Sequence, residues 1–318
     1  MRSMVTVALL LGACSGATSE HAHEHFEEVG ADRARLQSRL EARIAETRAA
    51  VPDSIDDFVV AIDLLDSGTS RRLSIDENVV LHAASTMKVP VLFELFRQAE
   101  AGELSLEDSV PIVNRFRSIL DGSTYTLTPA DDSEPTLYAR LGGHATYAEL
   151  ARLMIVRSSN LATNILIVRV DPRRVRDTLL RLNAQGMRVL RGVEDIPAYR
   201  AGLNNTTTAY GFSRVLEAIA RCELLTDVSC ERIADILAEQ EFDDGIPAGV
   251  PPGTRVANKT GWITAINHDG AIVYPPGRAP YVLVVLTRGI EEAAVANDLI
   301  ADLSGIVWQE VVDESGGP

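Results

Sequence analysis

Lysine is almost absent from this chain of 318 residues. Of its 30 basic residues only two are lysine, Lys88 in "AASTMK" and Lys259 in "VANKTGW", and the other 28 are arginine. Arginine keeps its proton in proteins, whereas a buried lysine amine can lose its proton and act as a base. We therefore expect a composition so biased towards arginine to retain lysine where arginine cannot replace it.

The sequence also lacks a net positive charge and a long apolar run. Its formal charge of −15 and pI near 4.9 argue against a nucleic-acid partner, whose phosphates need a basic face. No stretch is long and apolar enough to span a bilayer. With 46% hydrophobic and 24% charged residues, the chain is expected to form one large globular domain or two closely packed ones.

Residues 1–13 have the pattern of a signal peptide. Arg2 precedes a short apolar run at residues 5–11, and the segment "LGAC" ends at Cys14. A cysteine directly after a small-residue cleavage site resembles a bacterial lipobox, in which Cys14 becomes the lipidated first residue. Plain secretion is the alternative. We predict an exported protein, either periplasmic or tethered to the membrane by one N-terminal lipid.

Residues 14–30 have no apolar period and are predicted to form a flexible tether. His21, His23 and His25 alternate within it, a pattern that can bind a metal. A solvated linker is the favoured interpretation, because a flexible segment fixes no ligand geometry.

Cysteine is scarce, with three in the chain. Without Cys14, an even pair remains, Cys222 and Cys230, in a compartment expected to be oxidising. We predict a disulfide between them, with two buried free thiols as the alternative.

The predicted elements place strands at both ends of the chain. Residues 31–84 indicate an amphipathic helix followed by two strands, and residues 246–318 indicate three strands and a closing helix. Residues 85–245 are mainly helical after an irregular stretch at 100–145. The two sets of strands can share one sheet only if this helical block is an insertion. The predicted fold is α/β (α+β): an antiparallel sheet flanked by helices, built from both termini, with an inserted all-α subdomain and the active site in the cleft at their junction.

Ser85 and Lys88 lie three residues apart at the start of a predicted helix, so they share a face. A neutral Lys88 amine can take the proton of the Ser85 hydroxyl and make it a nucleophile. The motif is weak alone, because Ser-x-x-Lys arises by chance and an ordinary surface lysine would fit it. The scarcity of lysine favours the catalytic interpretation.

Two further motifs follow in order along the chain. "VRSSNLATN" places Ser158 and Asn160 at the start of a predicted helix, and "NKTG" places Lys259 on a predicted strand. Ser-x-x-Lys, Ser-x-Asn and Lys-Thr-Gly in this order resemble the motifs of the serine penicillin-recognising enzymes, and of the class A β-lactamases in particular. The resemblance covers nearly the whole mature chain and includes Asn164 in "SSNLATN" and the segment "NNTTTA".

The resemblance implies catalytic roles for three matched residues. Ser85 corresponds to the acylated nucleophile and Lys88 to its proton partner. Ser158 would pass a proton to the leaving nitrogen of the substrate. No metal and no organic cofactor is implied.

The resemblance also implies which residues bind the substrate. Asn160 would hydrogen-bond the amide side chain of the substrate. Lys259 and Thr260, followed by Gly261, would receive its carboxylate. The backbone N–H groups of Ser85 and Trp262 would form the oxyanion hole.

This sequence departs from the family pattern at three positions near these motifs. Ser159 stands where the family has a supporting acid. Trp262 follows Lys-Thr-Gly, where a small residue is usual, and is expected to narrow the site. The arginine expected on the neighbouring strand has no clear match, and His268 is the candidate near its place.

A fourth departure affects the water-activating glutamate. The family shows Glu-Pro-x-Leu-Asn, whereas this chain shows "RGVEDIPAYRAGLNN". Glu194 is the natural candidate, but Ala198 stands four residues on, where the family has asparagine. The alternative is a loop carboxylate that pairs with Arg191 or Arg200.

We predict a serine hydrolase that forms an acyl-enzyme, a β-lactamase that opens the amide bond of small-molecule β-lactams. A D,D-peptidase or esterase acting on peptidoglycan-like substrates, or a slowly deacylating penicillin sensor, is the alternative. A lipid-tethered metal-binding protein, suggested by the histidines of the tether, would leave the three motifs unexplained. The protein is expected to be a monomer.

Overall fold

Five antiparallel strands form the main sheet of the protein, in the order β2-β1-β11-β10-β9. The structure is a computed structural model that describes residues 17–51, 58–66 and 71–313. The strands are β1 (Val59–Asp66), β2 (Arg71–Ile75), β9 (Arg255–Ile263), β10 (Ile266–Tyr274) and β11 (Tyr281–Arg288). The prediction of one sheet made from both ends of the chain is confirmed, because β1 pairs with β11 along its whole length.

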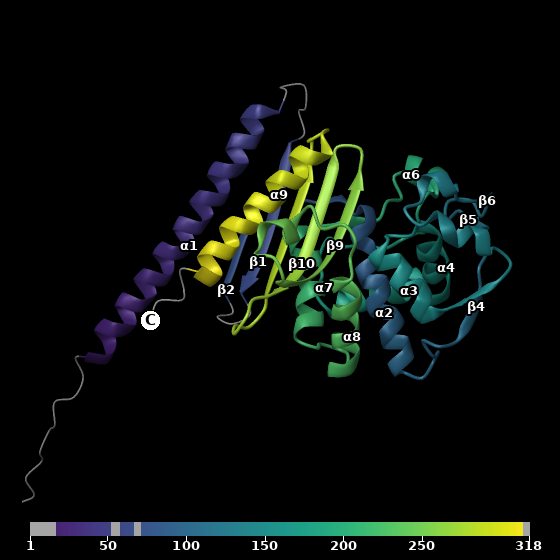
Figure 1. Ribbon diagram of the computed structural model, residues 1–318, viewed down its shortest axis with the longest axis horizontal. Helices are drawn as coiled ribbons and strands as arrows, with labels where there is room; N and C mark the ends of the chain where they lie inside the picture. The colour runs from purple at the N-terminus through teal and green to yellow at the C-terminus, as the bar shows by residue number, and fades with distance from the viewer. Residues whose placement is uncertain (1–16, 52–57, 67–70, 314–318) are drawn as a thin grey trace, which may run out of the picture.

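Each face of the sheet is covered by helices, because its strands bury side chains on both faces. On one face, α1 (Ala17–Ala50) and α9 (Ala293–Trp308) lie side by side and enclose an apolar core that includes Leu40, Ile62 and Leu299 (Figure 1). The other face packs against α7 (Ala209–Ala220). Its apolar core continues into the helical half of the molecule, so the two halves are one packed body.

The inserted segment is helical, as predicted. Its helices are α2 (Lys88–Glu100), α3 (Tyr147–Val156), α4 (Asn160–Val170), α5 (Pro172–Arg181), α6 (Ile196–Arg200), α7 and α8 (Asp227–Ala238). Short 3₁₀ helices accompany them: η1 (Ala84–Met87), η2 (Pro129–Asp131), η3 (Pro135–Arg140) and η4 (Ile246–Gly249), while the π-helical turn η5 (Gln309–Asp313) follows α9. The short strands are β3 (Leu81–His82), β4 (Ser109–Pro111), β5 (Phe116–Arg117), β6 (Thr124–Tyr125), β7 (His144–Thr146) and β8 (Thr206–Thr207). Among the described helices, none has an apolar stretch long enough to cross a bilayer.

The N-terminal segment differs from its prediction. α1 begins at Ala17, so residues 17–30 continue the helix instead of forming a flexible tether. Residues 17–29 contain neither proline nor glycine and are rich in alanine and glutamate, which favour helix even without an apolar period. The predicted signal peptide and Cys14 lie outside the described residues, as do the side chains of the alternating histidines. Within the part whose side chains are described, no three His, Cys, Asp or Glu side chains group to hold a metal.

Cys222 and Cys230 are free cysteines in the structure, so the predicted disulfide is not formed there. Cys222 follows α7 with a left-handed backbone, φ 54°, and Cys230 lies in α8. Burial raises the pKa of both thiols, which disfavours the thiolate from which a disulfide forms. The structure therefore agrees with the alternative interpretation, in which both cysteines are free thiols.

Candidate active site

Ser85 lies in the short helix η1, between β3 and the start of α2. The residue before it, Ala84, has a left-handed backbone with φ 45°, which is unusual for a residue with a side chain. The Ala84 N–H donates to Nδ1 of His82 at 3.1 Å. The predicted helix start at Ser85 is therefore a tight turn, and the regular helix begins at Lys88, with Pro90 in its first turn.

Lys88 is completely buried at the start of α2. Its Nζ donates to the carbonyl oxygen of Ser158 at 2.6 Å, to Ser158 Oγ at 3.0 Å and to Asn160 Oδ1 at 3.1 Å. Burial lowers the pKa of Lys88 to about 7, and the carboxylates of Asp132 and Glu194 limit this decrease. This lowered pKa makes loss of the Lys88 proton accessible near neutral pH, which arginine does not allow.

Ser158 and Asn160 lie where the chain enters α4, which begins at Asn160. Ser158 has φ 54°, and this left-handed turn places its hydroxyl beside Lys88. Ser159, which replaces the acid of the family pattern, accepts a hydrogen bond from the Ala162 N–H at 3.2 Å and caps the helix. The Ser-x-Asn and Ser-x-x-Lys motifs are thus in direct contact.

Asp132 supplies an acid at the start of α4 that was not predicted from the sequence. Its buried carboxylate accepts hydrogen bonds from the N–H groups of Asn160 at 3.1 Å and Leu161 at 2.8 Å. The Tyr138 hydroxyl and the Glu134 N–H donate to the same carboxylate. An acid at a helix N-terminus satisfies free N–H groups and stabilises the helix. Asp132 therefore fixes the start of α4, where Ser159 has no charge.

The Lys-Thr-Gly motif lies on β9, the edge strand nearest the helical half. Lys259 is buried, and its Nζ donates to the Thr260 carbonyl oxygen at 3.0 Å. Burial lowers its pKa well below the usual value, and the nearby Lys88 lowers it further. A Cβ atom on Gly261 would lie 2.8 Å from the Ser85 nitrogen, so only glycine lets β9 approach η1 this closely.

His268 lines the same cavity as Thr260 and Gly261. It lies on β10 opposite Gly261, and its Nε2 is 3.0 Å from the carbonyl oxygen of His82. Its Nδ1 accepts from the Thr287 N–H at 3.3 Å. Burial lowers the pKa of His268 to about 4, so the ring is neutral at pH 7. Its contacts tie β10 to the segment just before Ser85, and it adds no positive charge.

Glu194 faces Asn160. Asn160 Nδ2 donates to Glu194 Oε1 at 3.0 Å, and burial raises the pKa of the Glu194 carboxyl. The loop is held by Asn164, whose Oδ1 accepts from the Val193 N–H at 2.7 Å and whose Nδ2 donates to the Val193 carbonyl oxygen at 3.0 Å. The family position that carries asparagine four residues after the glutamate is Ala198 here, and it is buried.

Arg191 has other partners. Its guanidinium donates to the carbonyl oxygens of Leu203 and Gly192, both at 2.9 Å, and to Asn204 Oδ1 at 3.1 Å. These bonds join the two ends of the loop that contains Glu194. Arg200 is exposed at the end of α6. The alternative in which Glu194 is a carboxylate paired with Arg191 is therefore wrong.

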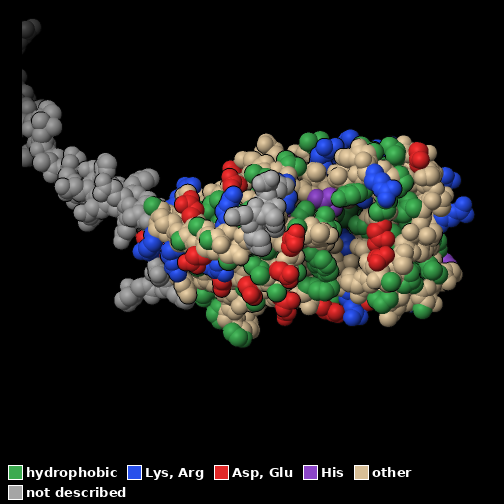
Figure 2. All heavy atoms as spheres, turned by 90° about the horizontal axis from the view of Figure 1, so that it is seen from above, with side chains coloured by type: hydrophobic (Ala, Val, Ile, Leu, Met, Phe, Trp, Pro, Cys, Tyr) green, Lys and Arg blue, Asp and Glu red, His purple; other side chains and the backbone are tan. Residues whose placement is uncertain are grey.

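A cavity of about 460 Å³ opens at the junction of the two halves, lined by Ser85, Ser158, Asn160, Glu194 and Trp262. Thr260 and Gly261 line a neighbouring cavity of about 180 Å³, which shares Trp262 with the first. Figure 2 shows the surface from above, with a hollow bordered by hydrophobic and acidic side chains. The structure therefore brings Ser85, Ser158, Asn160, Glu194 and Trp262 to one cavity and Thr260 and Gly261 to its neighbour. The two lysines are buried and line neither cavity, although Lys88 contacts Ser158 and Asn160.

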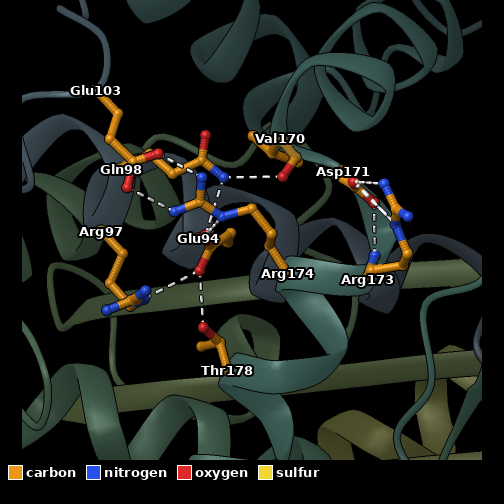
Figure 3. Close-up of polar contacts among 9 residues, drawn as sticks. All are labelled: Glu94, Arg97, Gln98, Glu103, Val170, Asp171, Arg173, Arg174 and Thr178. Atoms are coloured by element: carbon orange, nitrogen blue, oxygen red, sulfur yellow. Dashed lines mark hydrogen bonds and ion pairs between the residues drawn. The ribbon is translucent and has the colours of Figure 1, made fainter.

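α2, which carries Lys88 at its first turn, is anchored two turns later by the buried carboxylate of Glu94 (Figure 3). Glu94 accepts hydrogen bonds from Gln98 at 2.9 Å and from Thr178 of α5 at 2.7 Å. Arg97 and Arg174 pair with it at 3.0 and 3.3 Å. The carboxylate is fully satisfied, which is the condition for a buried charge to be tolerated. This network fixes α2 against α5.

The chain matches the beta-lactamase enzyme family over residues 39–311. A beta-lactamase from Rhodobacter capsulatus is 26% identical over 313 residues, covering 96% of this chain and 95% of that protein. Among solved structures, a beta lactamase from Xanthomonas campestris superposes with a TM-score of 0.73 at 25% identity, covering 87% of this chain and 98% of that one. A mutant of PBP-A, solved as an acyl-enzyme complex with penicillin G, superposes with a TM-score of 0.71 at 22% identity, covering 87% and 96%. Because the family model matches most of its length and solved beta-lactamase structures share its fold, the chain belongs to the beta-lactamase enzyme family.

Proposed function

We propose that this protein is a serine β-lactamase, which hydrolyses the β-lactam amide bond through an acyl-enzyme on Ser85. The observation that carries the proposal is the position of Glu194. Its carboxylate shares the cavity with Ser85 and is bonded to Asn160, which also contacts Lys88. A fast deacylating enzyme needs a base at this place.

In the acylation step, the Ser85 oxygen attacks the β-lactam carbonyl carbon and its proton passes to the neutral amine of Lys88. The N–H groups of Ser85 and Trp262 would stabilise the resulting oxyanion, and the close approach of Gly261 to the Ser85 nitrogen supports this assignment. Ser158, bonded to Lys88 at 3.0 Å, then gives a proton to the leaving nitrogen and recovers one from Lys88. The C–N bond breaks and the acyl-enzyme remains.

In the deacylation step, Glu194 removes a proton from a water molecule, which attacks the ester carbonyl. The partial burial that raises the pKa of Glu194 makes its carboxylate a stronger base than an exposed one. Lys259 and Thr260 receive the carboxylate of the substrate. An arriving anion would favour the protonated form of Lys259, whose pKa burial holds low.

A slowly deacylating penicillin-binding protein is the second candidate. A mutant of PBP-A that superposes on this chain was solved as an acyl-enzyme complex with penicillin G, which keeps this candidate open. The two candidates would use the same residues for acylation and differ only in the rate at which water hydrolyses the Ser85 ester.

Intact-protein mass spectrometry over time after adding a penicillin separates them. We expect a transient mass increase on Ser85 that disappears while the penicillin is consumed. A persistent adduct would support the penicillin-binding protein instead. If no adduct and no hydrolysis appear with any β-lactam, the proposed acylation is wrong. Ser85→Ala is the control that should show neither adduct nor turnover.

A further inference from the structure

The turn that precedes the nucleophile has an unusual backbone. Ala84 has φ 45°, a left-handed conformation that is unfavourable for a residue with a Cβ atom and persists only where surrounding contacts impose it. Because Ala84 is joined directly to Ser85, its conformation sets the position from which the Ser85 side chain extends. The contacts that hold this turn therefore help to place the nucleophile.

His82 supplies one of these contacts through its ring. The Ala84 N–H donates to Nδ1 of His82 at 3.1 Å. The backbone of the same segment is held by β8 and the residue before it, since His82 pairs with Thr206 and the Ala83 N–H donates to the Asn205 carbonyl oxygen at 3.0 Å. Among these contacts, the one made by the His82 ring binds the residue with the left-handed backbone.

His268 of β10 holds the carbonyl group of His82. Its Nε2 lies 3.0 Å from the His82 carbonyl oxygen, and its Nδ1 accepts from the Thr287 N–H at 3.3 Å. In a neutral ring whose Nδ1 is an acceptor, the proton is on Nε2 and is donated to His82. The His82 ring also meets the Tyr199 ring edge-on, with centroids 6.0 Å apart. A chain of hydrogen bonds thus leads from β11 through His268 and His82 to the turn at Ala84.

The contact between His82 and Ala84 requires a neutral ring. An imidazole nitrogen accepts a hydrogen bond only when it carries no proton, and in the imidazolium both nitrogens are donors. Burial lowers the pKa of His82, and the positive charge of Arg191 lowers it further, so the ring is neutral at pH 7. Protonation at acid pH would set an N–H of the ring against the Ala84 N–H. Further titratable groups that lie near this ring or line its cavity, among the described residues, are His268, Tyr199, Glu194 and Asp131.

We propose that His82 is a positioning residue for Ser85: its neutral ring holds the left-handed turn at Ala84 from which the nucleophile extends. His268 supports it by holding the carbonyl group of His82. In this role His82 acts through Ala84 and transfers no proton. The inference rests on the proposed function, since it assigns the turn to the acylation of Ser85. It adds a second group, besides Lys88, that must be neutral for acylation.

Leucine and asparagine at position 82 separate the hydrogen bond from the shape of the side chain. Both branch at Cγ like histidine, but only asparagine places an acceptor atom where Nδ1 lies. His82→Leu should slow the acylation of Ser85 by a penicillin by about 100-fold, the effect of displacing a reacting group by about 1 Å. His82→Asn should restore most of this rate. Circular dichroism checks that both variants are folded.

His144→Leu is the matched control. His144 is exposed on β7 and lines neither of the two cavities at the junction. This variant should be acylated at the parental rate, so a loss confined to position 82 would belong to the contact with Ala84.

The pH profile distinguishes this role from a merely structural one. In the parent, Lys88 and His82 must both lose a proton, so below the pKa of His82 the logarithm of the acylation rate should rise with pH with a slope of about 2. Asparagine does not titrate, so His82→Asn should have a slope of about 1, from Lys88 alone. Stopped-flow acylation between pH 4 and 8 measures both slopes.

A third measurement does not depend on acylation. NMR of the isotope-labelled protein follows the His82 ring and the Ala84 amide in one pH titration. In the parent, the Ala84 amide proton should shift together with the protonation of His82. In His82→Asn it should not move over the same range.

Three outcomes would overturn the inference: parental acylation by folded His82→Leu, equal slopes in the parent and His82→Asn, or an Ala84 amide that does not follow the titration of His82. If His82→Leu does not fold, the slopes and the NMR titration decide. Absence of acylation of the parent by any penicillin would instead overturn the proposed function, whereas a joint titration of His82 and Ala84 would still support the hydrogen bond that holds the turn.

Discussion

Asn160 Nδ2 lies 3.0 Å from Glu194 Oε1, and this hydrogen bond holds the glutamate at the cavity that Ser85 also lines. The loop sequence alone left Glu194 with two possible orientations, into the cleft or towards an arginine on its own loop. Its backbone at φ 60° and the two hydrogen bonds between Asn164 and Val193 turn the carboxylate inward. One residue, Asn160, then contacts both Glu194 and Lys88, so the groups proposed for the two steps are linked.

Glu194→Gln is expected to separate the two steps. The amide keeps the shape of the side chain but cannot act as a base, so Ser85 should still be acylated while the acyl-enzyme accumulates. Deacylation should slow by roughly 10²–10⁴, the usual contribution of a general base. Rapid-quench mass spectrometry measures both rates.

Arg200→Gln is the matched control on the same loop, since Arg200 is exposed and outside the cavity. It should deacylate like the parent. Turnover by Glu194→Gln at the parental rate would show that Glu194 is not the base.

Lys88→Arg is expected to abolish acylation while the protein remains folded. The positive charge is retained but the proton can no longer be removed. In the parent, the acylation rate should rise with pH through about 7, the pKa of Lys88, as the amine becomes neutral. Stopped-flow acylation between pH 5 and 9, with circular dichroism as a check of folding, tests both statements. A rate independent of pH across this range would contradict the role of Lys88 as base.

Lys88→Met should change how stability depends on pH. The pKa of Lys88 is about 7 in the folded protein, below the value of about 10.4 of an unfolded lysine. Between these two pH values the unfolded state binds more protons than the folded state. The free energy of unfolding of the parent therefore rises with pH in this range. Below pH 7, Lys88 is charged in the folded protein, and the full cost of burying that charge is present. The methionine variant lacks this dependence. The free energy of unfolding of Lys88→Met minus that of the parent should therefore be largest at pH 6 and should decrease by about 2–3 kcal/mol by pH 9.

Urea unfolding of both proteins at pH 6, 7.5 and 9 measures this difference. A constant difference across the three pH values would mean that Lys88 keeps its proton in the folded protein throughout this range, which would contradict the lowered pKa.

Asp132→Asn is expected to affect both stability and the pH profile. One acceptor oxygen becomes an amide donor that faces N–H or O–H groups, which should lower the free energy of unfolding by about 1–3 kcal/mol. The carboxylate also holds up the pKa of Lys88, so its loss should move the acid limb of acylation to lower pH. Asp131→Asn, the exposed neighbour, controls for the change in net charge. A loss of stability with an unmoved pH profile would leave Asp132 a purely structural residue.

Much of this site could be predicted because each motif that forms it spans only a few consecutive residues. The Ser85–Lys88 spacing, the Lys-Thr-Gly strand and the pairing of terminal strands follow from local patterns, and the structure has each of them. Asp132 could not be predicted, because it acts on α4 from a loop 28 residues earlier, and no spacing rule connects the two. The orientation of Glu194 depends on a left-handed backbone at a residue that is not glycine, which the surrounding fold imposes.

The N-terminal segment and the cysteine pair differ from their predictions for separate reasons. Residues 17–30 form helix through intrinsic propensity, although the absence of an apolar stripe argued for a tether. The cysteines were paired by counting and by the expected compartment; in the structure both are free thiols, although their side chains contact each other.

The pairing of β1 with β11 has a consequence for how the protein is made. Val59 and Arg288 are partners in the sheet but lie 229 residues apart (288 − 59). At a synthesis rate of about 5–20 residues per second, β1 waits roughly 10–45 s on the ribosome before its partner strand exists. Throughout that interval β1 can pair with β2, but its apolar residues and its other backbone edge stay open to other chains. We therefore expect nascent chains to associate with one another more readily before β11 is made than after it has paired with β1.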